Sequence, residues 1–132
     1  MVPVVCIGLE PRMSLFDLTG QVALVTGSSR GIGRAIAERM AEQGAQVVIS
    51  SRKQAACDAV ADAINARHGA GRAIAVAASI SSKDQLQALV DRTNAEFGRI
   101  DVLVCNAASN PYYGPQAGIS DEQFRKILDN NV

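Results

Sequence analysis

The sequence has no excess of charge of either sign, few aromatic residues and no tryptophan. Its 13 lysine and arginine residues balance 13 aspartate and glutamate residues, so the formal net charge is zero. A balanced chain lacks the basic surface with which proteins attract nucleic acid or anionic membranes, and we expect neither partner. With 48% hydrophobic residues, the 132-residue chain can still bury the core of one domain.

Cysteine is also sparse, and its spacing excludes two classes of protein. Cys6, Cys57 and Cys105 are an odd number and have no metal-ligand spacing. They predict neither a metal site nor a disulfide framework. Free thiols in a reducing cytosol fit the pattern better, so we expect a cytoplasmic protein.

Long hydrophobic runs are missing as well. The chain opens on MVPVVCIGLEPR, which is too short to span a bilayer and lacks the basic residue and clear cleavage site of a signal peptide. Met13 begins MSLFDLTGQVALVTG, which is a more natural start. We therefore expect residues 1–15 to be an unstructured extension and residues 16–132 to form the folded unit.

From residue 20 onward, β-rich apolar runs alternate with helical patterns. The runs predict strands at residues 21–26, 45–50, 72–78 and 101–106. They are continuously apolar, as expected when helices cover both faces of a parallel sheet. Repeated strand–helix units with short turns predict an α/β fold, a Rossmann-type doubly wound parallel sheet with four strands in the order 3-2-1-4.

The intervening helices are predicted from apolar spacing and end signals. Inward-facing residues are expected to be Ile32, Ile36 and Met40 in the first helix, Ala56, Val60, Ala63 and Ile64 in the second, and Leu86, Leu89, Val90 and Phe97 in the third. Capping boxes at Ser82–Gln85 and Ser120–Gln123 open the third and fourth helices. The fourth has an apolar face of Phe124, Ile127 and Leu128 that Asn131 shares, and it reaches Val132 without a stop signal. We therefore expect a truncated chain.

The segment TGSSRGIG, residues 26–33, directly follows the first strand and opens the first helix. Its glycines let the backbone turn tightly and approach a pyrophosphate, which the dipole of the following helix attracts. A tight turn without a ligand is the alternative. The position between a strand and a helix favours a nucleotide site.

The second strand ends in ISSRKQ, with no acidic residue from Ala45 until Asp58. Sites for NAD usually present an Asp or Glu about 20 residues after the glycines, to hold the ribose 2′-hydroxyl. Here Arg52 and Lys53 follow the strand, and Arg30 projects from the glycine segment. These charges are either solvated surface residues or donors to a 2′-phosphate, and the pattern favours NADP(H) over NAD(H).

The fourth strand ends in CNAAS, residues 105–109, whose small residues allow close approach to a ribose or nicotinamide. With the glycine segment and the terminal NNV, this makes the chain similar to the N-terminal half of a short-chain dehydrogenase/reductase. TGSSRGIG matches the T-G-x-x-x-G-x-G motif of that family, CNAA its N-A-G-type motif and NNV its helix asparagine motif. More narrowly, VVISSRKQ and NPYYG resemble the NADPH-dependent carbonyl-reductase and retinol-dehydrogenase-like branch.

The resemblance implies a role for each matching residue. Pyrophosphate would lie on the residues of the glycine segment, which are Thr26, Gly27, Ser28, Ser29, Arg30, Gly31, Ile32 and Gly33. Arg30 and Arg52 would select the 2′-phosphate. Adenine would lie by Ser79 and Ile80, the cofactor ribose by Asn106, Ala107 and Ala108, and Asn131 would be the catalytic asparagine. Ser79 and Ala108 depart from the Asp and Gly that are usual in the family.

The family's catalytic Ser, Tyr and Lys would lie beyond Val132. Tyr112 and Tyr113 cannot replace them, since no lysine follows at the family's spacing, and His68 is expected at the surface. The resemblance thus implies hydride transfer between NADP(H) and a small-molecule carbonyl or alcohol in a complete, homo-oligomeric protein, and an inactive 132-residue chain. A non-catalytic nucleotide- or partner-binding module, or a remnant that binds nothing well, remains as an alternative.

Overall fold

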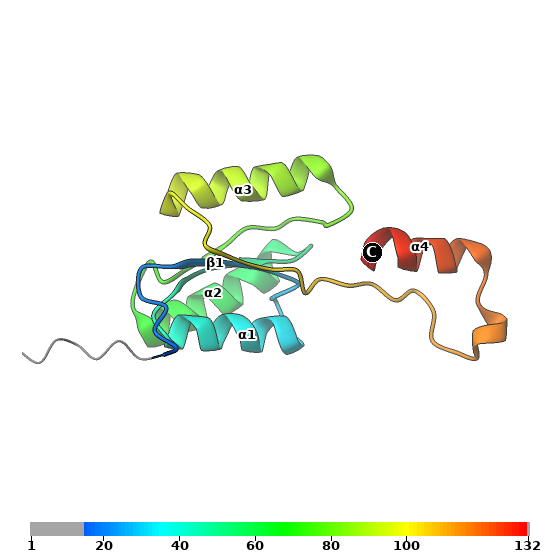
Figure 1. Ribbon diagram of the computed structural model, residues 1–132, viewed down its shortest axis with the longest axis horizontal. Coiled ribbons are helices and arrows are strands. Elements are labelled where there is room, and N and C mark those ends of the chain that lie inside the picture. Colours follow the sequence, from blue (N-terminus) through cyan, green and yellow to red (C-terminus); the bar gives the residue numbers. More distant parts are fainter. Residues whose placement is uncertain (1–14, 132) are drawn as a thin grey trace, which may run out of the picture.

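Four parallel strands form the single sheet of the molecule, whose computed structural model describes residues 15–131 (Figure 1). The strands are β1 (Val22–Thr26), β2 (Gln46–Ser50), β3 (Ala73–Ala75) and β4 (Val102–Val104). Their order is β3-β2-β1-β4, and each neighbouring pair is parallel. The predicted α/β doubly wound sheet and its strand order are thus confirmed. Nearly all of the extension expected at residues 1–15 lies outside the described residues.

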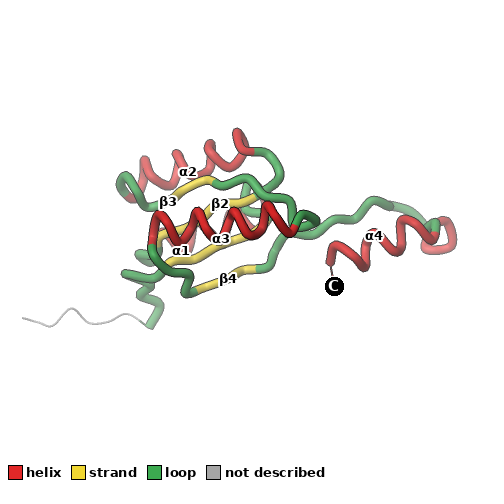
Figure 2. Tube along the Cα trace, turned by 90° about the horizontal axis from the view of Figure 1, so that it is seen from above, coloured by secondary structure: helices red, strands yellow, loops and turns green. Residues whose placement is uncertain are grey.

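Helices cover both faces of this sheet (Figures 1 and 2). They are α1 (Gly31–Glu42), α2 (Gln54–His68), α3 (Lys83–Phe97) and α4 (Asp121–Asn131), with a short 3-10 helix, η1 (Gln116–Gly118), before α4. α1 and α2 lie on one face and α3 on the other, whereas α4 lies beyond the sheet. Within the part of the chain that the structure describes, no helix is long and apolar enough to cross a membrane.

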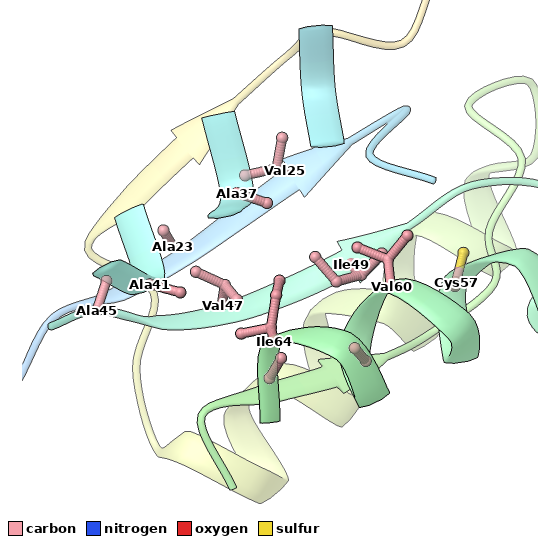
Figure 3. Close-up of a cluster of buried hydrophobic side chains, with 12 residues drawn as sticks. Ala23, Val25, Ala37, Ala41, Ala45, Val47, Ile49, Cys57, Val60 and Ile64 are labelled. Carbon is pink, nitrogen blue, oxygen red and sulfur yellow. The ribbon is translucent and has the colours of Figure 1, made fainter. Parts of the chain in front are cut away.

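The two faces of the central strands enter two separate cores. Ala23 and Val25 of β1 pack with Val47 and Ile49 of β2 against α1 and α2 (Figure 3). The residue between each pair points the other way, so that Leu24 and Val48 pack under Leu89 of α3. Side chains alternate between the faces of a strand, and both faces here are covered. This explains why the strands are continuous apolar runs.

The buried faces of the helices differ from the expected ones in three places. α1 buries Gly33, Ala37 and Ala41, while the side chain of Ile32 is 76% exposed. α2 buries Cys57 and Ala61 beside the expected Val60 and Ile64. In α3, Val90 is exposed and Thr93 is buried. Small side chains face the sheet in α1 because they let the helix approach it closely, a preference that hydrophobic spacing alone does not reveal.

Both predicted capping boxes cap a helix, but only one is reciprocal. At α4, the backbone amide of Gln123 donates to Ser120 Oγ (3.2 Å), and the backbone amide of Ser120 donates to Gln123 Oε1 (3.1 Å). At α3, the backbone amide of Gln85 donates to Ser82 Oγ (3.4 Å), but the side-chain oxygen Gln85 Oε1 accepts from the backbone amide of Ser79 (2.8 Å). Gln85 therefore holds the segment that follows β3.

α4 and the edge strand β4 leave apolar surface exposed. α4 has no buried residue, and its Phe124 and Leu128 are 51% and 44% exposed. Leu103 of β4 is 61% exposed, although it pairs with the buried Leu24 of β1. The apolar face of α4 that Asn131 was expected to share is therefore not buried, and Asn131 itself is exposed.

Candidate cofactor site

The carboxyl ends of the four parallel strands meet at one edge of the sheet, which is where open α/β sheets bind their ligands. The glycine segment, residues 26–33, follows β1 there, and Ser51 and Arg52 follow β2. The segments after β3 and β4 bring Ser79 and Asn106 to the same edge. The fold thus gathers the predicted cofactor residues, of which Thr26 and Ala107 lie 81 positions apart in sequence.

The glycine segment is packed against the segment that follows β4. Gly27 has a φ of +67°, and a Cβ there would lie 2.9 Å from the Cα of Ala107. A Cβ on Gly33 would lie 2.5 Å from the Gly27 carbonyl oxygen. Neither position tolerates a side chain. Gly31, with a φ of +57°, has open space beside it instead, so that a ligand can approach the backbone there.

The N-terminus of α1 has no capping side chain and no acidic residue in its first turn. Arg30 occupies the N-cap position in an extended conformation, with a φ of −162°. The first amide groups of a helix have no partner within it, and together with the helix dipole they attract anions. This end of α1 therefore suits a phosphate group.

Thr26 and Asn106 join the glycine segment to β4. Thr26 Oγ1 donates to the Val104 carbonyl (3.2 Å) and accepts from the amides of Asn106 and Ala107 (3.1 Å each). Asn106 Nδ2 donates to the carbonyls of Thr26 (3.0 Å) and Gly27 (3.2 Å). The side-chain amide of Asn106 therefore braces the glycine segment. Whether Asn106 also contacts a ribose stays a prediction.

Ser28 joins the glycine segment to β2 and is fully buried. Its Oγ donates to the Val25 carbonyl (2.7 Å) and accepts from the Ser50 amide (2.9 Å), while its own amide donates to the Ser50 carbonyl (3.0 Å). The Ser28 hydroxyl was among the expected pyrophosphate contacts, but it is hydrogen-bonded within the protein. Ser29 is half-buried and Ile32 is exposed in the first turn of α1.

The basic residues expected to bind a 2′-phosphate lie on two segments that hydrogen bonds between Ser28 and Ser50 hold together. Each of the two serines precedes one of the arginines, Arg30 and Arg52, by two positions. Both arginines and Lys53 are exposed, and none of the three has an ion pair among residues 15–131. Since no acidic residue lies between Ala45 and Asp58, their charges are not compensated locally.

The segment after β3 is not part of a strand, but hydrogen bonds hold it in place. The strand ends at Ala75, three residues before the predicted end, and the Ala77 backbone amide donates to Gln54 Oε1 (2.8 Å). The Ala78 amide donates to the Ser51 carbonyl (2.9 Å), so the segment stays beside the end of β2. Ser79 and Ile80 follow it, both half-buried. Their contact with an adenine stays a prediction.

Asn131 reaches the cofactor edge from α4. Its Oδ1 accepts from the Ser109 amide (2.9 Å) and its Nδ2 donates to the Ser109 carbonyl (2.8 Å), next to Ala108. Tyr112 lies farther along the same loop, and its hydroxyl donates to the Pro115 carbonyl (2.8 Å). His68 lies at the opposite edge of the sheet, where the strands begin. It lines a groove with Thr19, which precedes β1, and with Gln46, the first residue of β2. Among the described residues, no three His, Cys, Asp or Glu side chains gather into a metal site.

Ser81, Ser109 and Asn130 were given no role from the sequence, although Ser109 ends the CNAAS segment and Asn130 belongs to NNV. Ser81 Oγ donates to Asn130 Oδ1 (2.8 Å), and Asn130 Nδ2 donates to Ser109 Oγ (2.9 Å). Ser81 follows β3 and Ser109 follows β4, so that Asn130 connects the two segments. Only the fold brings these side chains together.

A parallel sheet of this order, with a glycine segment between β1 and α1, defines a Rossmann-type fold. The family model of the short chain dehydrogenases matches residues 21–132, and the chain belongs to that oxidoreductase family.

Relatives and solved structures agree with this family. The chain is 43% identical to an uncharacterized oxidoreductase of Methylorubrum extorquens over 87% of its length and 46% of the relative. It is 40% identical to dehydrogenase/reductase SDR family member 4 of Caenorhabditis elegans, over 86% of its length and 43% of the relative. The chain therefore spans about half the length of the curated relatives it matches.

Two crystal structures have the same fold over most of this chain. A short-chain type dehydrogenase/reductase from Mycobacterium marinum superimposes with a TM-score of 0.81 at 38% identity, over 89% of this chain and 47% of that one. A 3-ketoacyl-(acyl-carrier-protein) reductase from Brucella melitensis, complexed with NADH, gives a TM-score of 0.78 at 38% identity, over 87% and 45%.

Proposed function

We propose that residues 16–132 form the dinucleotide-binding part of an oxidoreductase that transfers hydride between a nicotinamide cofactor and a small carbonyl or alcohol. We further propose that the cofactor is NADP(H). The observation that carries the preference is the pair Arg30 and Arg52, both exposed and without an ion pair in the described chain, on segments that Ser28 and Ser50 hold together.

The residues present fit such a cofactor. Its pyrophosphate would lie on the backbone of residues 26–33, beside the open space at Gly31 and the uncapped N-terminus of α1. Arg30 and Arg52 would bind the 2′-phosphate, where a guanidinium forms paired hydrogen bonds. Asn106 would hold the glycine segment in shape, through its bonds to Thr26 and Gly27. The bound cofactor would supply or accept the hydride.

The solved reductase from Brucella melitensis is complexed with NADH, which supports a nicotinamide dinucleotide but not the phosphorylated form. The preference for NADP(H) therefore depends on charge. An NAD site usually has a carboxylate at the end of β2 for the ribose hydroxyls, and no acidic residue follows β2 before Asp58. Two cations and no anion at this position favour the ligand with the extra phosphate.

The experiment is a calorimetric titration of the chain with NADPH and NADH, before and after Arg52→Asp. We expect NADPH to bind more tightly, and the substitution to reverse this, because it removes a phosphate donor and adds a ribose acceptor. A hydrogen bond to a charged group contributes about 1.5–3 kcal/mol, so the affinity for NADPH should fall about tenfold or more. Arg67→Asp, the same charge change at the end of α2, is the control. Equal affinities that Arg52→Asp leaves unchanged would contradict the preference.

A non-catalytic nucleotide-binding module is the second candidate for the 132-residue chain. Hydride transfer to a carbonyl needs a group that protonates the forming alkoxide. The Tyr112 hydroxyl is bonded to the Pro115 carbonyl, and His68 lies at the far edge of the sheet. We propose that the chain binds NADPH without oxidising it. The complete enzyme would supply the missing acid, act in the cytoplasm and form a homo-oligomer.

A further inference from the structure

The described contacts of α4 with the rest of the molecule lie at its last turn. Its C-terminal end points back toward the sheet (Figure 1), and its apolar side chains Phe124 and Leu128 are exposed. Of its side chains, Asn130 and Asn131 form the hydrogen bonds that reach other described segments. A groove of 390 Å³ separates much of α4 from Ser81. Polar bonds rather than apolar packing therefore hold this end of the helix.

Asn130 connects the segments that follow the two edge strands of the sheet. β3 and β4 are the outermost strands of the order β3-β2-β1-β4. Neighbouring strands lie about 4.8 Å apart, so the two outer strands are separated by roughly 14 Å. Ser81, from the β3 side, donates to Asn130 Oδ1, and Asn130 Nδ2 donates to Ser109, from the β4 side. The half-buried side chain of Asn130 thus bridges the two segments at the edge where the cofactor would lie.

Asparagine suits this position because its amide carries both an acceptor and a donor. A serine hydroxyl lies on either side, each within 2.9 Å. The side chain of the neighbouring Asn131 forms hydrogen bonds only with the backbone of Ser109, on the β4 side. The link between the two segments therefore passes through Asn130.

We propose that Asn130 is a positioning residue that sets the distance between the segment after β3 and the segment after β4, and thereby the width of the dinucleotide site. The proposal rests on the proposed cofactor site, with the adenine on the β3 side, and it takes the ribose on the β4 side to be that of the nicotinamide. A ligand that contacts both segments depends on their separation, whereas a ligand that contacts only the adenine side does not.

The test compares NADPH with adenosine 2′,5′-bisphosphate, which lacks the nicotinamide half. Asn130→Ala should raise the Kd of NADPH about three- to tenfold, as expected for the loss of two part-exposed hydrogen bonds, and the Kd of the bisphosphate less than about twofold. Ser81→Ala should weaken NADPH in the same direction, and the double variant should bind no worse than Asn130→Ala alone.

Asp129→Ala is the matched control. Asp129 precedes Asn130, lines the same groove and has no hydrogen bond to either segment. It should leave both affinities unchanged. If Asn130→Ala leaves NADPH binding unchanged, or weakens both ligands equally, the positioning role is overturned while the proposed cofactor site stands.

A second readout needs no nucleotide. In the free chain, Asn130→Ala should speed amide hydrogen exchange at residues 79–82 and at residues 106–109 together, and Asp129→Ala at neither. If the unaltered chain fails to bind NADPH, the proposed function is wrong, and this exchange pattern alone decides the link. A change confined to one segment, or to none, overturns it.

Discussion

At the scale of single residues, several polar side chains that a motif assigns to a ligand hold the protein together instead. Ser28 is fully buried and bonds Val25 and Ser50. Asn106 gives its side-chain amide to the carbonyls of Thr26 and Gly27. Buried polar groups need partners, and these bonds satisfy them. The motif therefore shapes the glycine segment as much as it offers groups to a phosphate.

Gly27 of this segment and Gly20, which precedes β1, differ in what a side chain would meet. Gly27 and Gly20 both have a positive φ, of +67° and +79°, but a Cβ on Gly27 would lie 2.9 Å from Ala107 Cα, whereas a Cβ on Gly20 would meet nothing within 4 Å. Gly20→Ala should therefore lower the free energy of unfolding by about 1–2 kcal/mol, the cost of left-handed backbone alone. Gly27→Ala should lower it further.

Urea denaturation of the two variants, followed by circular dichroism, measures this difference. The two substitutions add the same methyl group at a similar φ, so each serves as the control of the other. If Gly20→Ala destabilised the chain as much as Gly27→Ala, the close packing of the glycine segment on the end of β4 would be refuted.

At the scale of elements, the start of β4 is fixed to β1 by one carboxylate. Asp101 Oδ2 accepts from the Val22 amide (2.8 Å), and Oδ1 accepts from Arg99 Nε (2.9 Å). The Arg99 hydrogen bond, and then the bond from Val22, lower the pKa of Asp101 below its ordinary value. The charged form of this side chain therefore favours the folded state.

The pH dependence of stability follows from that direction. A carboxyl with a lower pKa in the folded chain contributes stability above its unfolded pKa, about 3.9, and loses it as the pH falls through the folded pKa. Asp101→Asn should thus destabilise the chain by a constant amount between about pH 6 and pH 8, and by less below about pH 4. Urea unfolding of both proteins across this range measures the difference. A gap that stayed constant to low pH would contradict the assignment.

At the scale of the whole molecule, the β4 edge of the sheet leaves apolar surface exposed. Leu103 lies on the same face as Leu24 and Val48, which α3 covers, yet it is 61% exposed. β4 pairs only with β1 among the described strands, so its outer backbone groups have no strand partner. An edge strand with exposed apolar residues is prone to pair with another chain.

We expect the purified chain to self-associate through this edge. Leu103→Thr keeps a strand-forming residue while removing apolar surface, and should shift the molecular mass measured by light scattering toward the monomer. Leu15→Thr, at a side chain that is 91% exposed near the other end of the described chain, is the control and should leave association unchanged. A chain that is already monomeric at high concentration would show that the edge is adequately protected.

The sequence alone determined the approximate positions of the strands and helices and the position of the glycine segment, although β3 and β4 end three and two residues before their predicted ends. These features depend on neighbours within a few positions: apolar runs, the spacing of Ser120 and Gln123, and glycines between a strand and a helix. Such local preferences act along the chain and can be read from it.

Only the tertiary structure decided which side of α1 is buried, that the Ser28 hydroxyl turns inward, and that Asn130 meets Ser81 and Ser109. The last two contacts join residues 49 and 21 positions apart. No periodicity records them, because they depend on how β3, β4 and α4 are placed in space. Asn131 shows the same limit: its motif indicated the cofactor edge, but whether its helix is buried depends on what packs over it.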